Sequence, residues 1–278
     1  MGHHYLPQKY LNGFVREKRI WVHDRLDRRS FPSQPKSVAN ETDMYGSEVE
    51  AFLATQVEDP ALEVLDAVRA RKQFGAGERS ALARYVVALW RRVPRAREFV
   101  RQLMPSQAEA TRAEVHAALD NLLQTNPAQA DLIARKHQEA DQIVDRMGST
   151  GGVEIWQKML TTHQSTNVER ALLNMSWSFL ISEEVPYITG DNPVFFFERE
   201  GIGRPDSELT VPLSSSVALW AFNGRSKYPL YVAARPYAAR EVNRRTIAKA
   251  TRYVFDRDNA PWILPALMKP SHQHHRLR

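Results

Sequence analysis

Cysteine is absent from the 278-residue chain. Neither a disulfide framework nor a zinc site built on thiolates is therefore possible, and the absence fits a reducing cytoplasm. No run approaches the roughly 18–20 apolar residues that cross a bilayer, since the most apolar stretch, 171–181, contains Asn174 and Ser176. The first residues lack the apolar core of a signal peptide. We therefore expect a cytoplasmic protein with no membrane partner.

Several familiar catalytic signatures are also missing. The chain contains no phosphate-binding GxxxxGK[ST] loop, no GxGxxG after a strand, no HExxH and no GxSxG. The hydroxyl cluster at 214–216 lacks the glycines of a nucleophile elbow, so we do not expect a serine hydrolase. The composition, with 43% hydrophobic and 25% charged residues, is ordinary for a folded globular protein. The net charge of +6 is mildly favourable for a polyanion, so nucleic acid is one possible partner.

Hydrophobic periodicity predicts an α+β fold. Strand patterns are mainly confined to the region after Pro186, while the first two-thirds are rich in helical patterns, which we expect to pack on a mainly antiparallel sheet. The run 167–182 is apolar almost all round and predicts a central helix. Residues 105–147 predict a projecting pair of antiparallel helices, and Pro94 should kink or divide the preceding helix. We expect one domain over 1–278.

Two polar motifs lie far apart in the chain. The first is HHYLPQKYL at residues 3–11, and the second is ITGDNPV at residues 188–194, followed by Pro-Leu-Ser at 212–214. In order and spacing they resemble DUF4238, a bacterial family of unknown function whose pattern is His-His-Tyr-x-Pro-x-x-Tyr-Leu, then Ser-Asp-x-Pro-Val, then Pro-Leu-Ser. Gly190 stands where the family often has Ser. The resemblance covers most of the chain and implies no activity.

The histidines of the first motif suggest acid–base or metal chemistry, because imidazole titrates near neutrality and binds metals. His3 and His4 are adjacent, so in a strand they point to opposite faces. We expect one to enter a site and the other to brace the backbone. Tyr5 is a candidate substrate contact, and a hydrogen-bonded anchor that pins the segment to the body is the structural alternative.

The second motif supplies a carboxylate and an amide at a predicted strand end. Asp191 and Asn192 are candidate catalytic residues beside the histidines, and Asp191 with Glu50 could ligate Mg²⁺ or Mn²⁺. An Asx-turn at Asp191, and a helix-dipole role for Glu50, are the structural alternatives. Arg92 and Arg95 flank Pro94, where a guanidinium could turn inward to hold a phosphate or the Asp191 carboxylate.

Two functional hypotheses follow. The first is a metal-assisted phosphodiester hydrolase, such as a nuclease, with its site at the histidine pair and the GDNPV turn. The second is a non-catalytic binding or regulatory protein of a defence or toxin-linked system, in which both motifs are structural and the helical pair recognises a protein partner. A third and weaker hypothesis is nucleic-acid binding through the basic segment 235–252. The histidines at 272, 274 and 275 could bind a metal, but their position near the end of the chain favours a frayed, solvated terminus.

Overall fold

The computed structural model of the chain describes residues 2–162, 166–197, 201–225, 227–269 and 274–277. Contacts divide the chain into two compact units. The first unit comprises residues 1–93 and 162–278, and the second comprises residues 94–161. Each unit is described by itself.

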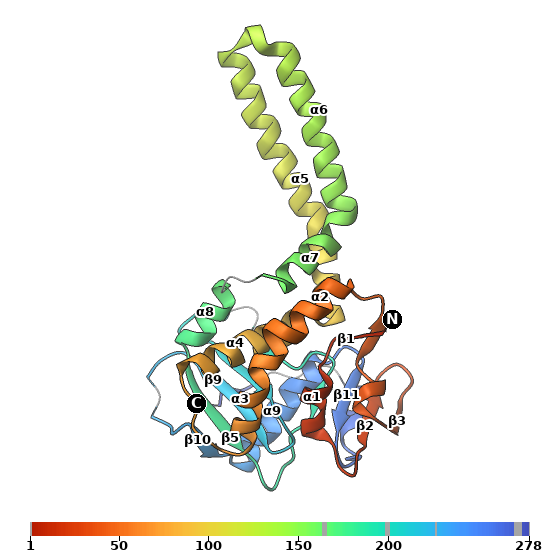
Figure 1. Cartoon of the computed structure of the whole chain (residues 1–278), viewed down its shortest axis with the longest axis vertical. Helices are drawn as coiled ribbons and strands as arrows, with labels where there is room; N and C mark the ends of the chain where they lie inside the picture. The colour runs from red at the N-terminus through yellow and green to blue at the C-terminus, as the bar shows by residue number, and fades with distance from the viewer. Residues whose placement is uncertain (1, 163–165, 198–200, 226, 270–273, 278) are drawn as a thin grey trace. The chain divides into compact units, whose positions relative to one another are not determined.

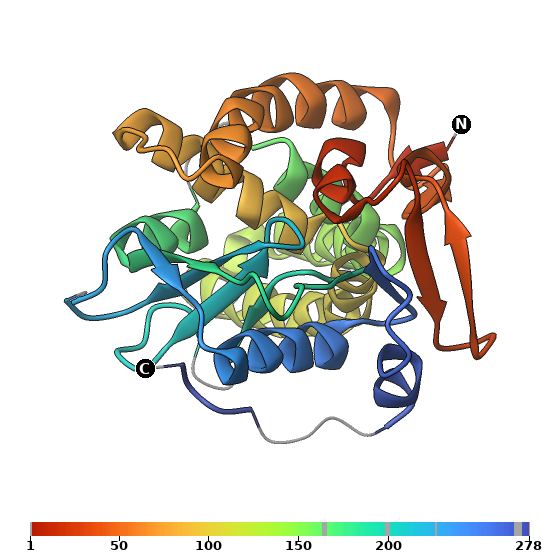
Figure 2. The same ribbon diagram turned by 90° about the horizontal axis from the view of Figure 1, so that it is seen from below.

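The first unit is built around a five-stranded sheet with the strand order β10-β5-β9-β8-β7. Its pairs are antiparallel except β10 with β5, which is parallel. Residues of β5 and β9 are buried nearly throughout, because helices cover both faces of the sheet (Figure 2). The strands are β5 (Ser176–Ile181), β7 (Phe195–Phe196), β8 (Glu208–Pro212), β9 (Val217–Phe222) and β10 (Tyr231–Ala233).

A second, four-stranded sheet joins distant parts of the chain in the order β3-β2-β11-β6. All its pairs are antiparallel, and β11 brings the late β6 alongside the early hairpin of β2 and β3. A small third pair, β1 with β4, carries the start of the first motif. These strands are β1 (Gly2–His4), β2 (Ile20–Asp24), β3 (Arg29–Ser33), β4 (Asn40–Thr42), β6 (Thr189–Gly190) and β11 (Tyr253–Asp256).

Helix α9 (Pro236–Lys249) packs on one face of the five-stranded sheet. Its Ala239 and Val242 enter one cluster with Leu180, Ala218 and Trp220 of the strands, since alternate strand residues share a face. The opposite face is covered by the early helices (Figure 2). The other helices of this unit are α1 (Gln8–Leu11), α2 (Ser47–Phe52), the π-helical η3 (Leu53–Glu58), α3 (Asp59–Arg69), α4 (Ala76–Arg91), α8 (Asn167–Asn174), α10 (Ile263–Leu267) and the short 3-10 turns η1 (Asn12–Phe14) and η2 (Pro35–Ser37).

The second unit is helical. The long α5 (Pro94–Thr125) and α6 (Ala130–Arg146) lie antiparallel (Figure 1), and the 3-10 turn η4 (Pro127–Gln129) joins them. The π-helical η5 (Met147–Gly151) and α7 (Gly152–Leu160) complete the unit. The single domain expected over 1–278, with the helical pair 105–147 as a subregion, stays a prediction, because a compact unit need not be an independent domain.

The α+β class is confirmed, and so is the division at Pro94, where α4 has ended and α5 begins. The predicted helix at 167–182 is wrong. Helix α8 ends at Asn174, and the remainder is the central strand β5. A strand buried on both faces is as uniformly apolar as a buried helix, so periodicity could not separate the two. No helix within the described residues has the length and apolar character to cross a membrane.

Candidate functional site

The first motif starts as a strand, which separates its two histidines. Strand β1 pairs antiparallel with β4, and His3 lies opposite Glu41. The His3 ring is buried and stacks on Tyr45 with 5.0 Å between ring centroids. Nε2 of His4 lies 3.1 Å from the side-chain amide nitrogen of Gln8. Because strand neighbours face opposite sides, the two imidazoles have different surroundings.

Arg92 holds the backbone of the first motif. Its guanidinium is buried at the end of α4, where Nη1 lies 2.5 Å from the carboxylate of Glu58. Nη2 donates to the carbonyl of His4 and, over 3.1 Å, to the hydroxyl of Tyr45. Tyr45 in turn donates to the same carbonyl over 2.9 Å, and burial raises the pKa of Tyr45 to about 12. The hydroxyl therefore stays protonated as a donor at neutral pH.

Arg92 does turn inward at the helix break, as the sequence suggested. However, the carboxylate that it contacts belongs to Glu58 and not to Asp191. Sequence reasoning missed Glu58, which lies among ordinary surface-type residues of a helical segment and carries no motif. Arg95 lies in α5 of the second unit, so its assignment to substrate binding stays a prediction.

Several buried polar atoms around Arg92 have no hydrogen-bond partner among the described residues. They are His3 Nδ1, His4 Nδ1, Glu50 Oε2, Tyr85 Oη and Arg92 Nε. Electrostatic coupling links Tyr45 to Glu50 and Tyr85 to Arg92, so these groups are neighbours. Buried polar atoms are partnered in the great majority of cases. A ligand with hydrogen-bonding groups would therefore gain bonds at this cluster.

Asp191 lies directly after β6 and binds the chain's own backbone. Its carboxylate accepts hydrogen bonds from the amides of Thr251 and Arg252 at 2.7 Å and of Tyr253 at 3.0 Å. The residue is only 5% exposed. Burial raises the pKa of the carboxyl, and the three amide donors oppose that shift. The side-chain amide of the neighbouring Asn192 donates to the carbonyl of Lys249 over 3.3 Å.

The two motifs meet through tyrosines. The buried hydroxyl of Tyr10 lies 2.7 Å from Oγ1 of Thr189 and donates to the carbonyl of Pro212 over 2.7 Å. One side chain therefore ties together HHYLPQKYL, ITGDNPV and Pro-Leu-Ser. Tyr5 is also buried, and the charge of Asp191 adds to burial in raising the pKa of its hydroxyl. Among the contacts of the described residues, no hydrogen bond or ion pair joins His3 or His4 to Asp191.

Arg69 strengthens the same junction. Its guanidinium donates to the carbonyls of Lys9, Tyr10 and Leu213. A Cβ added at Gly13 would lie 2.7 Å from the carbonyl oxygen of Leu213, so glycine permits the close approach of the two segments. Arg69 was not foreseen, because a single arginine at the end of a helix carries no sequence signal for such a role.

The described residues contain no group of three or more His, Cys, Asp or Glu side chains placed to hold a metal ion. Both oxygens of Asp191 accept amide hydrogen bonds, and Glu50 has Tyr45 as its neighbour. The expected Mg²⁺ or Mn²⁺ site at Asp191 and Glu50 stays a prediction.

An apolar cavity of about 240 Å³ lies beside the second motif. Its lining includes Trp90 and Val86 of α4 together with Val194 and Phe196. Hydrocarbon forms nearly all of this wall, and none of the candidate catalytic side chains contributes to it. The described lining of the cavity therefore lacks the polar groups that hydrolysis would need.

The sequence profile of the family described as "Protein of unknown function (DUF4238)" matches residues 2–260. The chain belongs to the DUF4238 family. The matched region includes both DUF4238 motifs and the tyrosine junction between them, and it ends before the 274–277 segment. No curated protein and no solved structure matches the chain. Membership in DUF4238 thus brings a sequence pattern without an assigned activity.

Proposed function

We propose that this DUF4238 protein is a non-catalytic binding protein in which both motifs are structural and the α5–α6 pair contacts a protein partner. One observation carries the structural half of the proposal. The Asp191 carboxylate, the Arg92 guanidinium and the Tyr10 hydroxyl all form hydrogen bonds with the chain's own backbone. Side chains so engaged fix the fold and leave few atoms for a substrate.

The partner half rests on the surface of α6. Leu132 and Ile143 are 52% and 56% exposed. They are eleven residues apart, which is close to three turns of 3.6 residues, so they share one face of the helix. Two large exposed apolar side chains on one face of α6 are the feature of this unit that favours contact with another protein.

The charge of the helical unit favours a protein over nucleic acid. Residues 94–161 contain eight Lys or Arg and nine Asp or Glu. Part of this charge is neutralised internally, since Arg112 pairs with Asp141 and Asp145 between the two helices. A surface without basic excess gains little from phosphate backbones.

The basic segment 235–252 does not form one exposed row either. Arg245 and Lys249 are buried, and Arg252 contacts Asp24 at 2.7 Å. Arg244 is exposed but lies 2.7 Å from Glu241, which further reduces the positive charge available to nucleic acid.

The test is a comparison of capture from the natural host. Tagged wild type is compared with Leu132→Glu/Ile143→Glu. The matched control is Gln138→Glu/Gln142→Glu, which adds the same two negative charges at exposed positions of the same helix. We expect one protein to be retained by wild type and control and lost with the double variant. The captured protein, once purified, should then bind purified wild type directly. Equal retention by all three folded proteins, or a partner that fails to bind when purified, would contradict the proposal.

A second function is supported by a different observation, the unpartnered buried atoms of His3, His4 and Glu50. These are the residue types that move protons and hold cations, so we keep metal-assisted phosphodiester hydrolysis at this cluster as the alternative, with Arg92 close to the substrate. Its test is cleavage of a broad RNA and DNA panel with Mn²⁺. A His4→Gln/Glu50→Gln variant that folds should lose cleavage. Wild type that cuts no substrate would rule this alternative out.

A further inference from the structure

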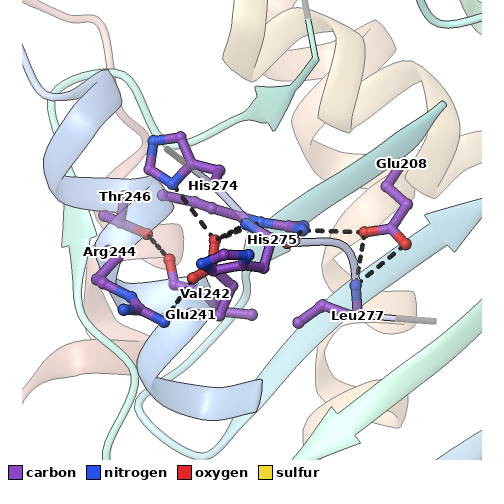
Figure 3. Close-up of polar contacts among 9 residues, drawn as sticks. Glu208, Glu241, Val242, Arg244, Thr246, His274, His275 and Leu277 are labelled. Carbon is purple, nitrogen blue, oxygen red and sulfur yellow. Dashed lines mark hydrogen bonds and ion pairs between the residues drawn. The ribbon is translucent and has the colours of Figure 1, made fainter. Parts of the chain in front are cut away.

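The 274–277 segment lies against β8 and α9 and is held mainly through its backbone (Figure 3). The amide of Leu277 donates to both carboxylate oxygens of Glu208 over 3.2 and 3.1 Å. The amide of His275 donates to Glu241 over 3.1 Å, and Arg245 donates to the carbonyl of His275. Backbone hydrogen bonds at alternate residues, here 275 and 277, are typical of an extended peptide that is bound along one edge.

Three side chains of the segment also make contacts: Leu277, His274, and Arg276, whose guanidinium carbon lies 4.8 Å from the centroid of the Phe197 ring. Leu277 is 8% exposed and packs in the core cluster that contains Tyr187, Trp220 and Val242. The ring of His274 lies edge-on to Phe195 with centroids 5.0 Å apart, and its Nδ1 is 3.3 Å from Glu241. The His275 side chain is exposed. The expected frayed terminus is therefore wrong for 274–277, whereas His272 lies outside the described residues.

Beside these apolar contacts, three buried charged side chains lie beneath the segment. Glu208 and Arg245 are 0% exposed and 2.9 Å apart, and Arg245 also lies 3.4 Å from Glu241. Nη1 of Arg245 has no hydrogen-bond partner among the described residues. Buried charges are costly unless hydrogen bonds satisfy them. Backbone amides and a carbonyl from the segment supply such bonds, so this surface is matched to a peptide.

We propose that Glu208, Glu241 and Arg245 form a peptide-binding groove, which the chain's own 274–277 segment occupies here. All three charged residues lie within the DUF4238 match, whereas the occupant lies beyond it. The groove takes an extended peptide with a large apolar residue at the place of Leu277. Two residues before that position, the backbone amide of the peptide donates to Glu241 and its carbonyl accepts from Arg245. Occupation by the 274–277 segment keeps the groove closed to a peptide in trans.

A trans-binding experiment tests the groove in the full chain. The probe is a fluorescein-labelled peptide with the sequence of residues 271–278, SHQHHRLR, and binding is followed by anisotropy. Leu277→Asp places a carboxylate in the apolar cluster and next to Glu208, so it should release the segment. His275→Ala is the matched control, because the His275 side chain is exposed.

We expect Leu277→Asp to bind the probe at least about tenfold more tightly than wild type or His275→Ala, since loss of one buried leucine contact changes affinity by that order. A probe with Asp in place of its Leu should not bind. If Leu277→Asp does not fold, Leu277→Ala makes the same comparison with a smaller change. A folded Leu277 variant that binds the probe no better than wild type does would overturn the proposal.

Discussion

Replacing Asp191 by Asn distinguishes a structural carboxylate from a catalytic one. The carboxylate accepts three amide hydrogen bonds while 5% exposed. Asparagine keeps one acceptor oxygen and turns an NH₂ group toward backbone amides, which are themselves donors. Hydrogen bonds to a charged group contribute about 1.5–3 kcal/mol each. The Oδ2 atom accepts from Arg252 and Tyr253, so asparagine with its oxygen at that place loses the bond from Thr251 and weakens the other two. We therefore expect the free energy of unfolding to fall by about 3–5 kcal/mol.

Urea unfolding followed by circular dichroism measures this change directly. Exposed Asp131 of α6 provides the control, since Asp131→Asn removes a charge without removing a buried bond and should stay within about 0.5 kcal/mol of wild type. A residue held for chemistry often tolerates its own replacement, or is even stabilised by it. If Asp191→Asn unfolds with wild-type stability, the structural interpretation of the GDNPV turn is wrong and the catalytic alternative gains.

Three further changes probe the junction and the second sheet. Tyr10→Phe leaves Thr189 and the Pro212 carbonyl without their partner, so the free energy of unfolding in urea should fall by about 1–3 kcal/mol. The control Tyr237→Phe, at an exposed tyrosine, should leave that free energy almost unchanged. Equal changes in the two variants would contradict the junction. Gly13→Ala should lower the melting temperature, because its Cβ would press on the carbonyl of Leu213, and an unchanged melting temperature would show that the segments separate freely. Burial raises the pKa of Asp24, but the Arg252 side chain and the backbone amides of Leu26 and Asp27 outweigh this effect and hold the pKa below its usual range. Asp24→Asn should therefore destabilise at neutral pH, and the difference from wild type should shrink as pH falls below about 4; a constant difference would rule out the linkage.

The sequence predicted the regular elements better than it predicted their contacts. The strands after Pro186 were predicted, whereas strand β5 was not. The run that contains β5 is apolar almost all round, so it shows no alternation that would mark it as a strand. The DUF4238 motifs marked the right segments, yet the side chains that join them are tyrosines and not the histidines. His3 and His4 were chosen as candidates because imidazole is chemically versatile. The spacing of the motifs does not indicate that the hydroxyl of Tyr10 bonds to both Thr189 and Pro212.

The partners that complete each polar centre were beyond sequence reasoning for a common reason. Arg69 and the Glu208–Arg245 pair bind backbone groups of segments far away in the chain, and Glu58 pairs with Arg92, which itself binds the His4 carbonyl. A backbone carbonyl or amide has no residue identity, so no pattern of letters records which side chain will bind it.

The same physics links the first motif to the 274–277 segment. In both places a short extended segment is fixed when buried arginine or glutamate side chains bind its backbone, at His4 through Arg92 and at Leu277 through Glu208. Charges that are buried in this way are strongly destabilised when their partner leaves. Detachment of either segment is therefore costly unless water or another peptide takes over these hydrogen bonds. For the first motif, which also carries Tyr10 in the core junction, detachment would disrupt the sheet contacts at Thr189. The 274–277 segment lies outside the matched DUF4238 region, and in the proposed exchange another peptide would supply the bonds to Glu208 and Glu241 and an apolar residue in place of Leu277.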